Sequence, residues 1–90
     1  MIHITQHALE RGRERLSLPP AALTKLAERA WTKGVRPKDT GGQFKKWLQT
    51  IDNTPRVYGE VVYVFTFYRK LPSLVTVYQV PVEFKKYLKA

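Results

Sequence analysis

An eight-residue run of β-branched and aromatic side chains, Val61 to Tyr68, constrains the fold of this chain more than any other segment. Both alternating faces of the run are largely apolar or aromatic, which predicts a central strand covered by helices on one face and only partly open on the other. Arg56 to Tyr58 precedes it across a tight turn at Gly59-Glu60, and Leu74 to Val80 follows a turn over Arg69 to Ser73. An antiparallel sheet of three or four strands is therefore expected.

Three amphipathic helices are predicted before the sheet. The first covers roughly Thr5 to Leu16, where Gly12 weakens the helix and so indicates close packing against another element. The second begins at Pro20 and ends at Gly34, with apolar residues at the spacing of a buried stripe. The third opens on a capping box from Thr40 to Gln43, in which the two side chains cap the helix reciprocally. The stripes of the second and third helices place two tryptophans in the core, Trp31 and Trp47.

Helices followed by strands are the order of an α+β fold. We expect one domain over residues 1–90, with two to three N-terminal helices packed on a three- to four-stranded antiparallel sheet and a short basic helix over residues 82–90. Hydrophobic residues make up 43% of the chain, which suffices for a small core. Neither a membrane-spanning run nor a signal-peptide pattern is present, so a cytoplasmic location is the default expectation.

The charge of the chain is strongly positive, and it limits the classes of partner. Sixteen Lys and Arg residues against seven Asp and Glu residues give a net charge of +9, spread along the whole sequence. Such a field favours phosphate polyanions and, less often, an anionic membrane or an acidic protein. The chain has no cysteine, and its two histidines, His3 and His7, stand outside any metal-ligand motif. We therefore expect no metal site and no cofactor.

Four side chains in the first predicted helix form the densest group of chemically capable residues. Measured around the helix from His7, Arg11 lies at about 40°, Glu14 at about −20° and Arg15 at about 80°. A histidine is suited to taking the proton of a ribose 2′-OH, and arginines are suited to stabilising charge on phosphate oxygens. The alternative is structural, because the same spacing also allows salt bridges along one helix face.

Further basic and aromatic residues are candidates for nucleic-acid contacts. Tyrosine stacks on bases or donates to phosphate, and lysine and arginine neutralise phosphates. The alternative for the tyrosines is ordinary strand packing, and for the lysines a solvated helix face. The candidates are Lys45, Lys46, Arg56, Tyr58, Tyr63 and Tyr78.

The sequence also resembles known proteins in several places. The motif His7-Ala8-x-x-Arg11-x-x-Glu14-Arg15 resembles the N-terminus of small prophage and mobile-element proteins, and is loosely similar to a helix of the RelE/BrnT-like ribonuclease-toxin superfamily. The agreement continues through Thr40-Gly-Gly-Gln-Phe-Lys-Lys-Trp-Leu, Arg56-Val-Tyr58-Gly and Leu74-Val-Thr-Val-Tyr78. That superfamily places one or two helices before a compact antiparallel sheet, so the resemblance implies the same fold.

The resemblance implies a small RNA-directed protein, a candidate metal-independent endoribonuclease of the toxin type. His7 would act as acid or base, Arg11 and Arg15 would bind phosphate, and Glu14 would position an arginine or the 2′-OH. An acidic antitoxin would then bind the same basic surface. The alternative is a non-catalytic prophage accessory protein that binds nucleic acid or a host protein complex, including defence machinery.

Overall fold

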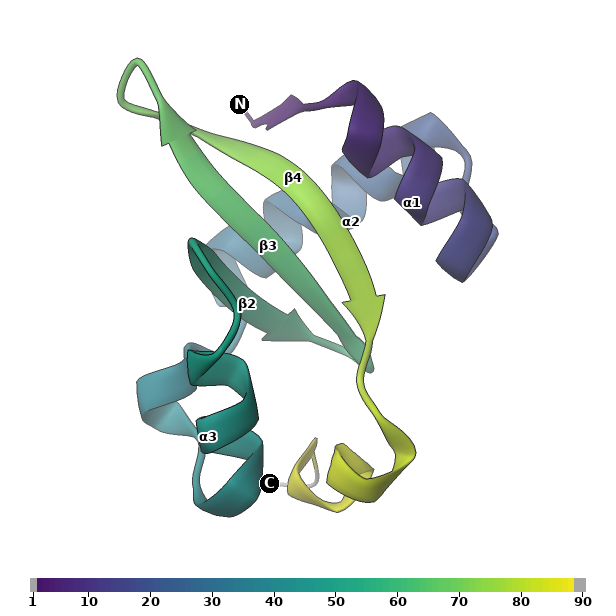
Figure 1. The fold of residues 1–90 in the computed structure, drawn as a ribbon. Helices are drawn as coiled ribbons and strands as arrows, with labels where there is room; N and C mark the ends of the chain where they lie inside the picture. Colours follow the sequence, from purple (N-terminus) through teal and green to yellow (C-terminus); the bar gives the residue numbers. More distant parts are fainter. Residues whose placement is uncertain (1, 89–90) are drawn as a thin grey trace.

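The computed structural model describes residues 2–88 and contains a four-stranded sheet in the order β1-β4-β3-β2 (Figure 1). Strands β2 (Thr54–Tyr58), β3 (Val61–Tyr68) and β4 (Leu71–Gln79) form an antiparallel meander. Strand β1 (His3–Ile4) adds to β4 in parallel, with His3 opposite Ser73. The expected α+β fold is confirmed, but the sheet is mixed rather than fully antiparallel. A two-residue strand carries no periodicity, so the sequence does not reveal it.

Helices cover both faces of this sheet. Helices α1 (Gln6–Leu16) and α2 (Pro20–Lys33) pack on one face, as expected from their apolar stripes. The opposite face is covered at one end by α3 (Gly42–Gln49) and by the 3₁₀ helix η2 (Val82–Leu88), which lie below the sheet in Figure 1. A single 3₁₀ turn, η1 (Pro37–Asp39), joins α2 to α3.

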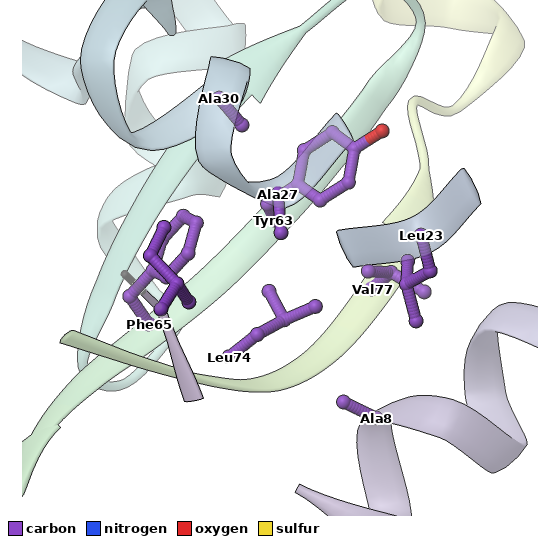
Figure 2. Close-up of a cluster of buried hydrophobic side chains, with 9 residues drawn as sticks. Ala8, Leu23, Ala27, Ala30, Tyr63, Phe65, Leu74 and Val77 are labelled. Carbon is purple, nitrogen blue, oxygen red and sulfur yellow. The ribbon is translucent and has the colours of Figure 1, made fainter. Parts of the chain in front are cut away.

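Two apolar cores result from this arrangement, one on each face. The first joins α1 and α2 to the sheet, and Figure 2 shows its side chains pointing inward from both layers. The second joins α3 and η2 to the sheet. Strand β3 serves both cores, because its successive side chains point to opposite faces. The first core contains Leu23, Ala27, Tyr63, Phe65, Leu74 and Val77, and the second Phe44, Leu48, Val62, Val64 and Val80.

Helix α1 lies where the sequence predicts it, one residue shorter at its start. Thr5 is its N-cap, and the Thr5 hydroxyl accepts a hydrogen bond from the Ala8 amide at 3.1 Å. Gly12 is buried against α2, where a Cβ atom would lie only 2.8 Å from Cδ2 of Leu23. The expectation that Gly12 marks close packing is therefore confirmed.

The predicted capping box at the start of α3 is wrong. Instead of capping α3, the Thr40 hydroxyl donates to the carbonyl of Pro37 at 2.7 Å and closes η1. The N-cap of α3 is Gly41, which has no side chain to accept a bond, and Gly42 follows with a φ of +62°. The local 3₁₀ turn competes for the threonine hydroxyl, and the capping box does not form.

The turn between β3 and β4 is also shorter than predicted. It consists of Arg69 and Lys70 alone, with φ values of 52° and 68°, and β4 begins at Leu71 rather than at Leu74. Two consecutive positive φ values give the turn the twist that matches antiparallel strands, although glycine or asparagine is the usual choice. Pro72 lies inside β4, one residue before the pairing with β1.

The other boundaries differ by one or two residues. Strand β2 begins at Thr54, two residues before the predicted start. The predicted basic helix over 82–90 is a 3₁₀ helix from Val82 to Leu88, and its last two residues lie outside the described residues. Among the helices of residues 2–88, none has the length and the apolar character to cross a membrane.

Candidate nucleic-acid interface

Helix α1 lies along the edge of β4, and two long-range hydrogen bonds hold its C-terminal end there. The Arg15 guanidinium donates to the carbonyl of Val77 at 2.9 Å, and the side-chain amide of Gln79 donates to the carbonyl of Arg15 at 2.9 Å. Strand β1 pairs only with Ser73 and Leu74, so α1 takes the place of a further strand beside the rest of β4. The side chain of Arg15 is thus bonded to the backbone of β4, and the backbone of Arg15 is bonded to a side chain of β4.

The Arg15 guanidinium lies over an aromatic ring at this edge. Its central carbon is 4.8 Å from the centroid of the Tyr78 ring, which is the geometry of a cation–π contact. Trp47 of α3 and Gln79 complete an open groove of about 300 Å³. The Val77 carbonyl occupies one of five guanidinium N–H groups, so several donors remain for a ligand. We call this set of four residues, Arg15, Trp47, Tyr78 and Gln79, the edge groove.

The other predicted catalytic residues lie further along α1. Arg11 forms an ion pair with Glu14 at 2.8 Å, and both side chains reach the solvent. The pair agrees with the expectation that Glu14 positions an arginine, although it equally satisfies the structural alternative. His7 is exposed in the first turn of the helix. At 1.5 Å per residue, His7 lies about 12 Å from Arg15 along the helix axis, so these two residues are not arranged around one reacting atom.

The two predicted lysines lie on α3, the helix that carries Trp47 of the edge groove. Lys45 is half-buried and Lys46 is exposed, and both precede Trp47 in the same helix. Neither lysine lines the edge groove. Their contact with nucleic acid stays a prediction.

Tyr63 is not part of any surface, and its prediction as a nucleic-acid contact is wrong. The residue is 2% exposed, and its ring points toward the helix that carries Ala27 and Ala30 (Figure 2). Burial raises the pKa of Tyr63 to about 12, with a smaller contribution from Tyr58. Alternation along a central strand shows which residues share a face, but it does not show which face the helices bury more deeply. The sequence alone therefore does not tell a buried tyrosine from an exposed one.

The remaining candidates, Arg56 and Tyr58, lie away from the edge groove. Both belong to β2, at the other edge of the sheet, and point toward the α2 side. The Arg56 guanidinium carbon is 4.9 Å from the centroid of the Trp31 ring. The predicted contact residues thus divide between two separate places, which the linear sequence does not indicate.

Two residues of the edge groove were not among the predicted contacts. Trp47 was assigned to the core, and it does pack against Phe84 with ring centroids 5.6 Å apart. It is nevertheless only half-buried and also lines the groove. Gln79 is the last residue of β4 and has no periodic signal. Helical spacing predicts that Trp47 faces the core. It does not show that the outer edge of the large indole ring stays exposed and lines a groove.

Comparisons with protein-family models, with curated proteins and with solved structures found no match. Within residues 2–88, no group of three or more acidic or histidine side chains is placed to hold a metal ion.

Proposed function

We propose that the protein binds single-stranded RNA in the edge groove. The observation that carries this proposal is the Arg15 guanidinium stacked 4.8 Å over Tyr78 beside the half-buried indole of Trp47. Aromatic faces stack on unpaired bases, and a guanidinium group binds phosphate through two parallel hydrogen bonds. A net charge of +9 attracts the polyanion to this surface.

Single strands suit the groove better than duplexes. The aromatic side chains of Tyr78 and Trp47 can stack only on a base whose face is exposed. The bases of a duplex are paired and stacked on one another, so they offer no free face. The groove is open to solvent rather than enclosed, so a strand can lie across it without threading. Arg11, His7 and the α3 lysines provide further polar contacts on either side of the groove.

A second candidate function, RNA cleavage, is favoured by one specific arrangement. His7, Arg11 and Arg15 follow one another at four-residue intervals along the helix that ends at the edge groove. A strand lying along α1 would bring a ribose to His7, which would take the 2′-OH proton while the 2′ oxygen attacks phosphorus. The 5′ oxygen then leaves and takes up a proton from water, and the product carries a 2′,3′-cyclic phosphate.

A protein partner is the remaining alternative for this basic surface. An acidic antitoxin, or an acidic face of a host complex, would be attracted by the same charges that attract RNA. Such a partner would cover Arg15 and Tyr78, so it would compete with a single strand for the edge groove.

Fluorescence anisotropy with a labelled RNA of about ten nucleotides tests the proposal. We expect tighter binding to the single strand than to the matching duplex, and an affinity that falls as salt rises. Arg15→Gln should weaken binding and reduce the slope of log affinity against log salt by about 0.7, the value for one phosphate contact on a single strand. Arg13→Gln is the matched control, because Arg13 projects from the opposite side of α1, about 200° away.

Two results would contradict the proposal. One is an affinity for single strands that does not respond to salt. The other is equal loss of affinity in the Arg15→Gln and Arg13→Gln proteins, which would indicate attraction by overall charge rather than by the edge groove.

A further inference from the structure

A second concave region lies at the other edge of the sheet, beside β2. It consists of two adjoining pockets that share Lys33 and Asp39. One has a volume of about 340 Å³, and we call it the aromatic pocket because it is bounded by Phe44, Tyr58 and Tyr87. The other has a volume of about 360 Å³ and is almost entirely polar; we call it the cationic pocket. Because Lys33 and Asp39 line both, the two pockets lie next to each other.

The cationic pocket carries more positive than negative charge. Its described lining holds three cations, Lys33, Arg36 and Arg56, and one carboxylate, Asp39. Asp39 lies 3.6 Å from Arg36, which is 51% exposed, so this ion pair is loose. Burial lowers the pKa of Arg56, and repulsion from the charge of Arg36 lowers it further. An anion placed between these cations would relieve the repulsion.

The aromatic pocket suits a flat, partly polar group. The rings of Phe44 and Tyr87 are stacked at 5.9 Å with an angle of 25° between their planes. Gly42 allows this arrangement, because a Cβ atom there would lie 3.0 Å from the Tyr87 hydroxyl oxygen. The apolar part of the lining includes Val57, and the Tyr87 hydroxyl can donate or accept a hydrogen bond. A volume near 340 Å³ lies at the small end of ligand sites, which suits a single ring system.

We propose that the joined pockets bind a nucleotide, with the base in the aromatic pocket and the phosphate in the cationic pocket. A base has an aromatic face to stack on the ring of Tyr87 and an edge to hydrogen-bond with the Tyr87 hydroxyl. A phosphate has the charge and geometry that Arg36, Arg56 and Lys33 accept. Two sources supply this chemistry: a free nucleoside monophosphate and the phosphorylated end of an RNA strand.

This site is separate from the edge groove. The two lie at opposite edges of the sheet, β2 at one and β4 with α1 at the other. Nucleotide binding beside β2 therefore does not depend on RNA binding by Arg15 and Tyr78, and Arg15→Gln should leave it unchanged.

NMR titration of the ¹⁵N-labelled protein tests the proposal. Gly34 lines the cationic pocket and Gly59 the aromatic pocket, so their amide signals report each part. We expect a nucleoside 5′-monophosphate to shift both signals, inorganic phosphate to shift only Gly34, and the nucleotide to bind at least fivefold more tightly than phosphate. Arg36→Gln should weaken nucleotide binding at least fivefold, and Arg29→Gln, which removes an exposed charge of α2 outside both pockets, should not.

Several results would overturn the proposal. They are the absence of shifts at millimolar nucleotide, equal affinity for nucleotide and inorganic phosphate, and equal weakening by Arg36→Gln and Arg29→Gln. Lys33→Gln provides a second variant of an exposed residue and should also weaken binding.

To separate the two sources, an RNA with a 5′-phosphate is compared with the same RNA lacking it, both in the Arg15→Gln protein. If only the phosphorylated RNA displaces the nucleotide, the ligand of the site is the phosphorylated end of a strand. If neither RNA displaces it, the ligand is the free nucleotide.

Discussion

Replacing Tyr78 by leucine separates stacking from charge in the edge groove. Tyr78 is partly buried against the α3-side core, and the Arg15 guanidinium carbon lies 4.8 Å from the centroid of its ring. Leucine retains the apolar contact but removes the aromatic face. Stacking of one base on one aromatic ring contributes about 1–3 kcal/mol. Because about 1.4 kcal/mol corresponds to a tenfold change, we expect single-stranded RNA to bind roughly 5- to 150-fold more weakly.

The salt dependence of binding distinguishes this effect from a loss of charge. Tyr78→Leu removes no cation, so the slope of log affinity against log salt should stay at the wild-type value while the whole line shifts. Anisotropy at three or more salt concentrations measures both quantities, and thermal unfolding of the variant checks that the fold is retained. The expected combination is a large loss of affinity with an unchanged slope.

The hairpin between β3 and β4 supplies a matched control. Tyr68 is 61% exposed there, and the Arg69 guanidinium carbon is 5.4 Å from its ring centroid. Tyr68→Leu therefore removes the same kind of pair at a place outside the edge groove, and it should leave RNA affinity within twofold of wild type. The reasoning is refuted if Tyr78→Leu also stays within twofold, or if both variants lose affinity equally.

Three further predictions concern catalysis and stability. If the protein cleaves RNA, it should do so in EDTA and leave a 2′,3′-cyclic phosphate, and His7→Ala should abolish cleavage without lowering the Tm; intact RNA at high protein concentration would exclude catalysis. Gly12→Ala gains about 1 kcal/mol of helix propensity but forces a methyl group against Leu23, an overpacking that costs about 1–3 kcal/mol. We expect the Tm to fall by about 4–8 °C for each kcal/mol of net destabilisation, and to fall less in a Leu23→Val background; a higher Tm for the single variant would contradict this. The raised pKa of Tyr63, about 12, means that the unfolded chain loses this proton first as pH rises above about 10. Denaturant titrations should therefore show the free energy of unfolding falling between pH 10 and 12, by up to about 2 kcal/mol, and falling less in Tyr63→Phe.

The fold was predictable where the signal was local. Apolar periodicity locates α1, α2 and α3, and the run from Val61 to Tyr68 locates the central strand. Gly12 predicts a close contact, because a glycine inside a helix otherwise only weakens it, and the structure places Leu23 against it. Elements that depend on distant partners were missed. Strand β1 exists only because residues 3 and 4 meet residues 73 and 74. The capping box fails for a local reason, because the Thr40 hydroxyl bonds to Pro37 in the preceding 3₁₀ turn.

The candidate site was predictable in its residues but not in its pairing. Arg15 and Tyr78 were both identified as candidates, one from a helix ridge and one from a strand. Their contact depends on α1 packing along the edge of β4, which joins Arg15 to Val77 across 62 residues of sequence. Trp47 was assigned to the core because helical spacing does not show that one edge of a large indole remains exposed. Arg56, Tyr58 and Tyr78 are all predicted contacts, but the sequence does not show that strand order places Arg56 and Tyr58 at the opposite edge from Tyr78.

The pairing of the third and fourth residues with positions 73 and 74 has a consequence for synthesis on the ribosome. Helices of 11 and 14 residues are barely stable alone, and those of this chain have no sheet to pack on until β3 and β4 have been made. About 60 residues separate the end of α1 from the end of β4, so at roughly 5–20 residues per second the first helix waits about 3–12 seconds. Folding is thus delayed until nearly the whole chain has been translated, and the nascent N-terminal half spends that interval as a basic, unpacked polypeptide.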